Sequence, residues 1–244
     1  MTDGVGVPDM QQLPLEVSLA DYALFETYFA GPNDACVHAL RDAARVAAQA
    51  FVWVWGGEQS GRSHLLQACI NAAEANGARP AYLPLGADVG LIPDSIDGLE
   101  ICDVICVDDA HTVAEDAAWE RALLLLYEGV RQRGGRLVIS ADKAPLHSAF
   151  RLPDLVSRFA SAATFRLRDL SDDDRVHAMQ LRARWRGLEL PDDVARYILT
   201  RAERGMASLF DLLDRLDREA LVAQRGLTVP FVREVLAKVP VGGS

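Results

Sequence analysis

The sequence predicts a parallel α/β domain followed by a small all-helical domain, and three observations carry this prediction. A buried strand, Phe51–Trp55, runs into a glycine-bounded turn and then into a helical pattern. A second apolar strand ends in the paired acids Asp108 and Asp109. From Leu170 onward the 244-residue chain carries only helical patterns. We expect a mobile tail over residues 1–21, an α/β domain over 22–168 and a helical domain over 169–244.

Strands and helices are expected to alternate along the α/β part. An Ala-rich pattern predicts a helix over 35–49 before the first strand, and the turn after that strand opens a helix over 62–76. Further along, strands are predicted over 81–85, 104–108 and 136–140, with a helix over 114–133. In the helical part, helix starts are predicted at the Ser171 cap cluster, at Pro191, at Met206 and at Thr228.

The turn after the first strand has the pattern of a phosphate-binding loop. Glycines let backbone N–H groups converge on an anion, and the helix N-terminus adds its partial positive charge. Ser63 stands where a hydroxyl would hold Mg²⁺. The candidate nucleotide contacts are Gly56, Gly57, Glu58, Gln59, Ser60, Gly61, Arg62, Ser63 and His64.

Arg62 departs from the motif, which has Lys at this position. Lys is a compact point charge that reaches between the two terminal phosphates, whereas Arg is a broad planar fork. Arg can bind a diphosphate, but it fits the geometry of hydrolysis less well. From this loop alone, a glycine-rich turn without a ligand stays open as the alternative.

The paired acids form the second half of the predicted site. Ligands of parallel α/β sheets gather at the carboxyl ends of the strands. Asp108 is placed to hold Mg²⁺ through water, and Asp109 could polarise an attacking water. The strand over 136–140 should end beside them, which would bring Ser140 or Asp142 near a terminal phosphate. The alternative is that both acids cap the following helix.

An aromatic cluster over Tyr22–Phe29 precedes a Gly31-Pro32-Asn33 turn. It is either a flap of the core or a wall for a flat base beside the phosphate loop. Upstream, Met10–Leu15 is a short apolar stretch in a polar context, which is typical of a frayed terminus but also of a docking peptide.

Composition excludes several functional classes. Half of the residues are hydrophobic, yet no apolar run approaches the roughly 20 residues of a membrane span. The N-terminus lacks a basic-then-apolar signal pattern, so we expect a cytoplasmic protein. A net charge of −10 argues against broad contacts with a phosphate backbone, and action near DNA would pass through another protein.

Taken together, these pieces resemble the DnaA-related AAA+ family of the bacterial replication-initiator clade, over about residues 10–239. The resemblance rests on the loop Gly56–Ser63 running into His64-Leu65-Leu66 and on Leu152–Arg158. Two stretches of the helical part, 181–192 and 223–232, add to it. It implies an AAA+ P-loop parallel αβα sandwich followed by a small all-α lid. DnaA itself carries a further DNA-binding domain, which the resemblance does not cover here.

The resemblance also implies a function. Members of this family bind ADP, attach to the β sliding clamp by an N-terminal peptide and stimulate hydrolysis of ATP held by DnaA. Arg158 is similar to the arginine finger that reaches into the neighbour's nucleotide site in trans, and the expected role is negative regulation of replication initiation, the regulatory inactivation of DnaA. The clamp-binding residues would be Gln11, Leu13, Pro14 and Leu15.

Two positions depart from the family pattern. The clamp peptide has Gln where this chain has Met10, and the lid has a phosphate-sensing Arg where this chain has Ala207, with Arg204 one turn away. With Arg62 in the loop, two groups that favour a γ-phosphate are altered. We therefore expect ADP with Mg²⁺ as the ligand, with ATP as the alternative, and weak or no ATPase activity of the protein's own.

Two other functions remain open at this stage. The chain could be a self-acting P-loop ATPase, or a DnaA-like initiation or loader ATPase. Arg62 argues against the first and the acidic balance against the second. The sequence leaves the oligomeric state undecided, including a homo-oligomer.

Overall fold

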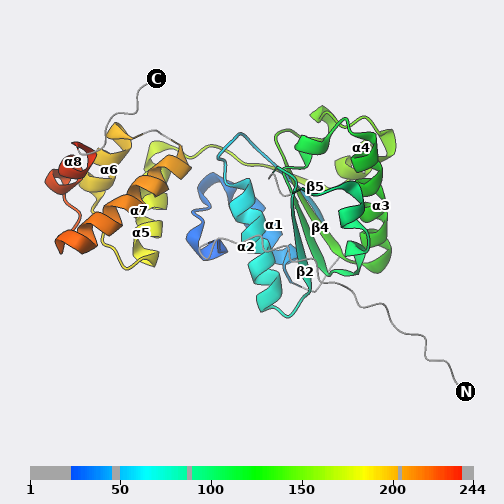
Figure 1. Ribbon diagram of the computed structural model, residues 1–244, viewed down its shortest axis with the longest axis horizontal. Coiled ribbons are helices and arrows are strands. Elements are labelled where there is room, and N and C mark those ends of the chain that lie inside the picture. Colours follow the sequence, from blue (N-terminus) through cyan, green and yellow to red (C-terminus); the bar gives the residue numbers. More distant parts are fainter. Residues whose placement is uncertain (1–22, 46–49, 87–89, 203–204, 238–244) are drawn as a thin grey trace, which may run out of the picture.

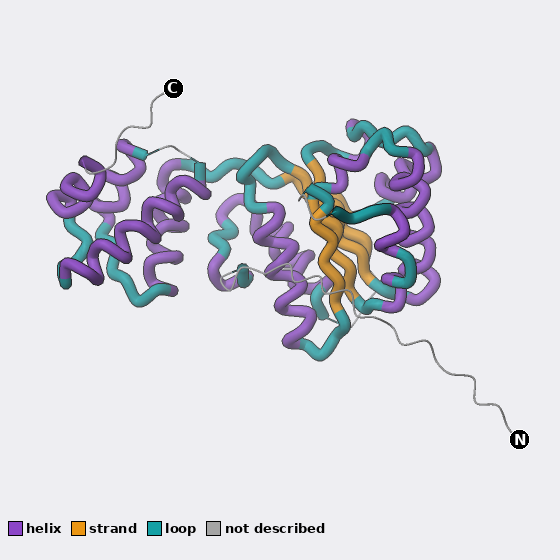
Figure 2. Tube along the Cα trace, in the orientation of Figure 1, coloured by secondary structure: helices purple, strands orange, loops and turns teal. Residues whose placement is uncertain are grey.

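A computed structural model describes residues 23–45, 50–86, 90–202 and 205–237. Its α/β part is built on one five-stranded parallel sheet, with the strand order β2-β3-β4-β1-β5. Figures 1 and 2 show this sheet between two layers of helices. The strands are β1 (Ala50–Trp55), β2 (Pro80–Pro84), β3 (Val104–Asp108), β4 (Arg136–Ala141) and β5 (Ala163–Arg166).

Each face of the sheet has its own hydrophobic core, because successive strand side chains point to opposite faces. Val52 and Val54 belong to the core that includes residues of α1 (Asp34–Ala43) and α2 (Arg62–Ala75). Trp53, between them, belongs to the core of α3 (Ala117–Arg133) and α4 (Pro153–Ala160). The helix that follows the phosphate-binding turn therefore lies on the opposite face of the sheet from α4 (Figure 1).

Most predicted elements are confirmed, with shifted ends. The helix predicted over 35–49 spans Asp34–Ala43, and residues 46–49 lie outside the described part of the chain. The helix predicted over 114–133 begins only at Ala117. Its cap is Asp116, whose carboxylate accepts the backbone N–H groups of Ala118 and Trp119. The alternative in which Asp108 and Asp109 cap this helix was therefore wrong.

The edge strand β5 has no counterpart among the predicted elements. Phe165 is its only partly buried residue, and the other three are exposed. The segment therefore shows neither an apolar run nor an alternating pattern. Its strand conformation comes from pairing with β1 over Val52–Trp55, which is a tertiary effect that a local pattern does not carry.

The helical part contains α5 (Asp172–Trp185), α6 (Asp192–Arg201), α7 (Met206–Ala223) and α8 (Val229–Ala237). All four predicted starts are confirmed to within a residue. Ser171 caps α5 in a capping box, exchanging hydrogen bonds with Asp174. A separate core, in which Met179, Ile198, Leu209 and Leu213 are fully buried, holds the four helices together.

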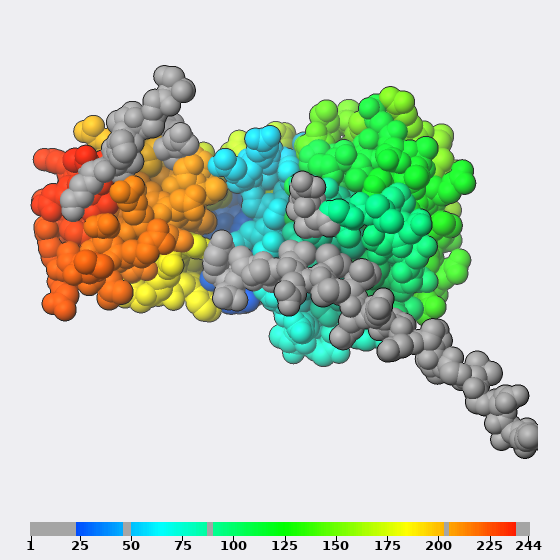
Figure 3. Space-filling view, viewed as in Figure 1, coloured from blue at the N-terminus to red at the C-terminus, as the bar shows by residue number. Residues whose placement is uncertain are grey.

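Residues that precede α1 contact the linker and the helical part. The Asn33 side chain, 4% exposed, accepts the backbone N–H of Arg168 at 2.7 Å and donates to its carbonyl at 3.1 Å. The indole Nε1 of Trp185 donates to the carbonyl of Glu26 at 3.2 Å. Figure 3 shows the blue segment near residue 30 between the two parts. None of the helices in the described ranges has the length and apolar character that crossing a bilayer requires.

Candidate functional site

The predicted phosphate-binding turn connects β1 to α2 and has a strained, glycine-dependent backbone. Gly61 has φ +91°, and a Cβ there would lie 2.8 Å from Cε2 of Tyr28. A Cβ on Gly56 would lie 2.8 Å from the hydroxyl oxygen of Ser60. Gln59 adopts φ +58°, which is uncommon for a non-glycine residue. These restrictions explain why glycine occupies both ends of the turn.

Arg62 closes this turn from its own helix. Its Nη1 donates to the carbonyls of Gly56 and Gly57, the second at 3.3 Å. Its Nη2 donates to the Asp109 carboxylate at 2.8 Å, and the Arg62 side chain is only 10% exposed. The two ends of the guanidinium fork therefore hold the loop carbonyls and Asp109 together, which a lysine ammonium would do less well.

The two acids at the end of β3 have different surroundings. Asp108 is 4% exposed and accepts the Tyr82 hydroxyl at 2.6 Å and the Ser140 hydroxyl. Burial, with the Asp108 charge, raises the pKa of Tyr82, so this phenol stays protonated and donates. Asp109 has φ +53°, its backbone N–H donates to Ser140 at 2.8 Å, and its carboxylate faces Arg62.

Ser140 and Asp142, at the polar end of β4, were predicted to lie near a terminal phosphate. Ser140 is fully buried and supports both acids. Asp142 pairs with its neighbour Lys143 at 3.7 Å. Neither Ser140 nor Asp142 lines the two cavities beside the loop that are described next.

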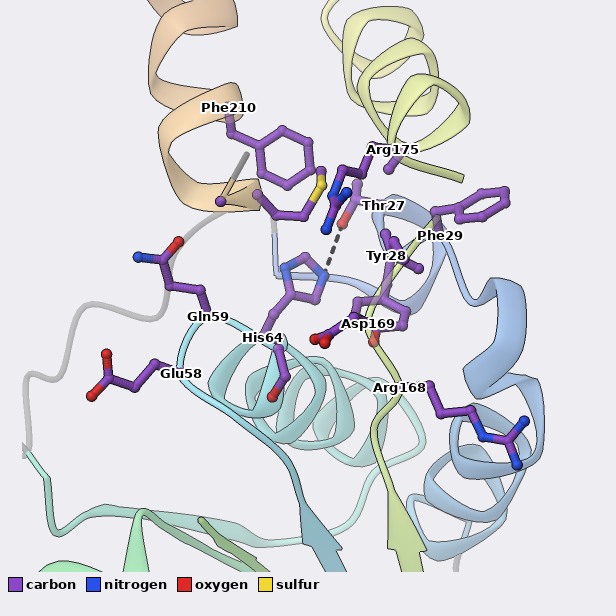
Figure 4. Close-up of a pocket in the computed structure, with 16 residues that line it drawn as sticks. Thr27, Tyr28, Phe29, Glu58, Gln59, His64, Arg168, Asp169, Arg175 and Phe210 are labelled. Atoms are coloured by element: carbon purple, nitrogen blue, oxygen red, sulfur yellow. Dashed lines mark hydrogen bonds between the residues drawn. The ribbon is translucent and has the colours of Figure 1, made fainter. Parts of the chain in front are cut away.

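A cavity of about 190 Å³ lies between the loop and the helical part (Figure 4). Tyr28 and Phe29 come from the aromatic cluster, and Phe210 comes from α7 on the opposite side of the cavity (Figure 4). The Phe29 ring points away from the cavity and lies against His177, with ring centroids 5.7 Å apart. Arg168 and Asp169 come from the segment that joins the two parts, and Arg175 comes from α5. Tyr28 thus stands where a base wall was predicted, whereas Phe25 packs into the core at 5% exposure.

His64 forms the floor of this cavity at the start of α2. Its Nε2 lies 3.0 Å from the Leu24 carbonyl oxygen and 3.4 Å from the Thr27 hydroxyl, the contact drawn in Figure 4. Burial, together with the charge of Arg182, lowers the pKa of His64. The neutral ring donates from Nε2 to the Leu24 carbonyl and stacks obliquely on Tyr28, with ring centroids 5.5 Å apart.

A second cavity, of about 430 Å³, borders the same loop. Its lining includes Ser63, Asp109 and Ala207, which are predicted positions, and Arg182, which is not. Both cavities are lined by residues 58–61 and by Phe210, and together they reach the size typical of small-ligand sites.

A nucleoside diphosphate fits this arrangement. The loop has the glycine turn, the helix N-terminus and the guanidinium that a diphosphate needs. The Ser60 hydroxyl oxygen is buried in it and makes no hydrogen bond to any described residue. The aromatic and apolar walls on the other side suit a base.

Magnesium fits in part. Hydroxyl and carboxylate oxygens are suitable donors, and Ser63 lines the phosphate-side cavity. Asp108 lies behind it, with both carboxylate oxygens already accepting hydroxyl groups. Among the described residues, no group of three or more His, Cys, Asp and Glu could hold a metal by protein ligands alone.

Arg158 lies in α4, across the sheet from both cavities. Its side chain is 43% exposed, and its Nε donates to Glu128 at 2.6 Å. The predicted clamp-binding residues, Gln11, Leu13, Pro14 and Leu15, lie outside the described residues, as do Met10 and Arg204.

Sequence reasoning missed the contributions of the helical part to the cavities. Arg168, Arg175, Arg182 and Phe210 are ordinary residues of amphipathic helices and of a linker in the sequence. Their place in the site follows from how α5 and α7 dock, and the Arg182 stack on Phe210, at 4.9 Å, has no local signal. Only the Asp/Arg composition of these helices could have suggested a charged lining.

Comparison with known proteins identifies the fold. Residues 172–236 match the protein-family model described as "Hda, lid domain". Domain III of DnaA from Thermotoga maritima is 19% identical, with a TM-score of 0.72, and the match covers 89% of this chain and 96% of that one. AMPPCP-bound DnaA from Aquifex aeolicus is 18% identical, with a TM-score of 0.66, over 82% of this chain and 66% of that one.

A more distant match is the RuvB branch-migration motor of Thermotoga maritima, at 14% identity and a TM-score of 0.63, covering 88% of this chain and 69% of that one. At these identities the solved structures establish the fold alone. The α/β part with its helical appendage has the AAA+ architecture, in which the helical part is the lid.

Proposed function

We propose that this chain, whose helical part matches the Hda lid model and whose fold is that of DnaA domain III, is an ADP-bound negative regulator of replication initiation. It stimulates hydrolysis of ATP held by DnaA, through Arg158 acting in trans. Docking on the β sliding clamp through Gln11–Leu15 and a cytoplasmic location complete the proposal.

The position of Arg158 carries this proposal. It is on the opposite face of the sheet from α2, so it cannot serve the protein's own phosphate loop. Its half-exposed guanidinium is nevertheless held at the surface of α4. A positive group in this setting is suited to a phosphate on another molecule.

The chemistry asked of Arg158 is charge stabilisation. Negative charge spreads over the transferred phosphoryl group as its bond to the leaving oxygen breaks. A guanidinium that contacts this group offsets the charge, an effect that reaches ~10³–10⁵ in rate in other nucleotide hydrolases. No proton needs to move to or from Arg158.

The protein's own site is adapted for binding rather than turnover. Asp109, which would polarise a water, is paired with Arg62. Ala207 supplies no charge where the lid would sense a terminal phosphate. The loop N–H groups and Arg62 would hold the diphosphate, Ser63 would contact Mg²⁺, and Asp108 would reach it through water. Bound Mg²⁺ would neutralise phosphate charge.

The experiment measures hydrolysis of ATP pre-bound to DnaA, with the ADP-loaded protein and with clamp loaded on DNA. We expect the wild type to accelerate hydrolysis and Arg158→Ala to leave it at the basal rate. Arg196→Ala is the matched control, because Arg196 is a half-exposed, ion-paired arginine of the lid. An Arg158→Ala protein that still stimulates would end the finger assignment.

A self-acting ATPase is the second candidate, and the glycine turn with its adjacent acids favours it. The same assay without DnaA distinguishes the two. Multiple turnovers by this protein alone would support the ATPase, whereas stoichiometric retention of ADP supports the regulator.

A further inference from the structure

The exposed arginine of α4 is not a free side chain. Its Nε donates to Oε1 of Glu128 at 2.6 Å, from the neighbouring helix α3. The other oxygen of the same carboxylate, Oε2, lies 3.2 Å from Nε of Arg131. Glu128 is 26% exposed, so this pair is at the surface and partly shielded from water.

We propose that Glu128 is a positioning residue for Arg158, which sets the orientation of its guanidinium before the partner's triphosphate arrives. The inference rests on the proposed function. Nothing in the family motifs points to Glu128, because α3 reads as an ordinary core helix with charged residues on its outer face.

Glu128 can orient Arg158 without blocking it, because the contact uses only the Nε–H group of the guanidinium. Nε lies at the inner edge of the guanidinium, and Glu128 uses it alone. Neither terminal amino group of Arg158 hydrogen-bonds to any residue in the described ranges. Those two groups form the edge that binds a phosphate in bidentate fashion. The carboxylate therefore anchors the side chain and leaves its phosphate-binding edge available.

Anchoring matters because a long side chain loses rotamer freedom when it contacts a transition state. A guanidinium that is already oriented loses less, and small displacements of a catalytic group reduce rates strongly. Bridging by Arg131 also offsets the charge of Glu128, so Arg158 keeps its attraction for a phosphate.

The test separates orientation from charge. Glu128→Ala removes the acceptor, whereas Glu128→Gln keeps an oxygen that can accept from Nε and removes the negative charge. We expect Glu128→Ala to lower the maximal stimulated hydrolysis roughly three- to ten-fold, with an unchanged half-saturating concentration. Glu128→Gln should restore most of it. Glu74→Ala, at an exposed glutamate of α2, is the control.

Comparing the Glu128 variants with Arg158→Ala distinguishes failure of the positioning role from failure of the proposed function. If Arg158→Ala abolishes stimulation while Glu128→Ala equals the wild type, the positioning role is wrong and the finger stands. If Glu128→Ala stimulates more than the wild type and Glu128→Gln does so equally, Glu128 acts only as a charge.

A second measurement does not depend on stimulation. The Nε–H proton of Arg158, assigned by comparison with Arg158→Lys, should exchange slowly with water in the wild type and in Glu128→Gln. It should exchange fast in Glu128→Ala. Equal, fast exchange in all three proteins would overturn the proposal even if DnaA is not the partner.

Discussion

At the scale of single residues, the buried carboxylate of Glu120 holds the backbone that leads into α4, the helix of Arg158. No sequence motif points to this residue. Glu120 is 2% exposed and accepts the backbone N–H groups of Glu115, Arg151 and Leu152, the last at 2.6 Å. Arg151 and Leu152 lead directly into α4. One side chain of α3 thus satisfies the donors of the segment on which the proposed finger depends.

Replacing Glu120 by Ala should lower the free energy of unfolding by about 3 kcal/mol, because three backbone donors lose a charged acceptor. Urea denaturation measures this change. Glu74→Ala is the control, since Glu74 is an exposed glutamate of α2. A loss below about 1 kcal/mol would show that water replaces the carboxylate at little cost.

His64 predicts a pH effect on stability. Burial lowers its pKa in the folded protein from the ordinary value of 6.5. Below that pH the unfolded chain binds a proton that the folded one does not, so the free energy of unfolding falls as the pH decreases. Above it both states are neutral and the contribution is constant.

His64→Gln should therefore lose less stability than the wild type between pH 7 and about 5. Denaturation series at fixed pH values measure the slope. His147→Gln, at an exposed histidine, is the control. A His64→Gln slope equal to that of the wild type would contradict the assignment.

At the scale of elements, the buried side chain of Asn33 helps to hold the linker between β5 and α5. Asn33 both accepts from and donates to the backbone of Arg168. Arg168 and Asp169 line the cavity beside the loop, so the same contact positions the lid and the proposed base site.

Asn33→Ala should reduce stability by about 1–3 kcal/mol, because it leaves a backbone donor and acceptor without a partner. It should also weaken ADP binding several-fold, because the lid docks less firmly. Calorimetric titration and denaturation measure the two effects. Loss of stability with unchanged ADP affinity would show that the Asn33–Arg168 contact does not influence the proposed base site.

Elements with a strong local pattern could be predicted, and those made by tertiary pairing could not. The run Phe51–Trp55 and the Ser171 cap carry their structure in the sequence. The strand over Ala163–Arg166 does not, since its neighbours and not its side chains make it a strand.

The site follows the same division. The loop, the paired acids and the aromatic wall have local signals. The hold of Arg62 on Asp109, 47 positions apart, and the lid residues around Phe210 depend on packing that no local pattern encodes. Asp108 is also more enclosed than its place at a strand end predicts, because Tyr82 from the neighbouring strand reaches it.

At the scale of the whole molecule, the two proposed functional surfaces lie on different sides of one sheet. The proposed diphosphate site is between the loop and the lid, and Arg158 is on the far helical layer. In the proposed function the first surface binds a nucleoside diphosphate, while the second acts on a partner's triphosphate. We propose that Arg62 and Ala207 make the first surface favour the diphosphate.

Calorimetric titration of the nucleotide-free protein with ADP and with ATP, in the presence of Mg²⁺, tests this claim most directly. We predict clearly tighter binding of ADP, near one nucleotide per chain, and no continuing heat of hydrolysis with ATP. Tighter binding of ATP accompanied by multiple turnovers would contradict the account.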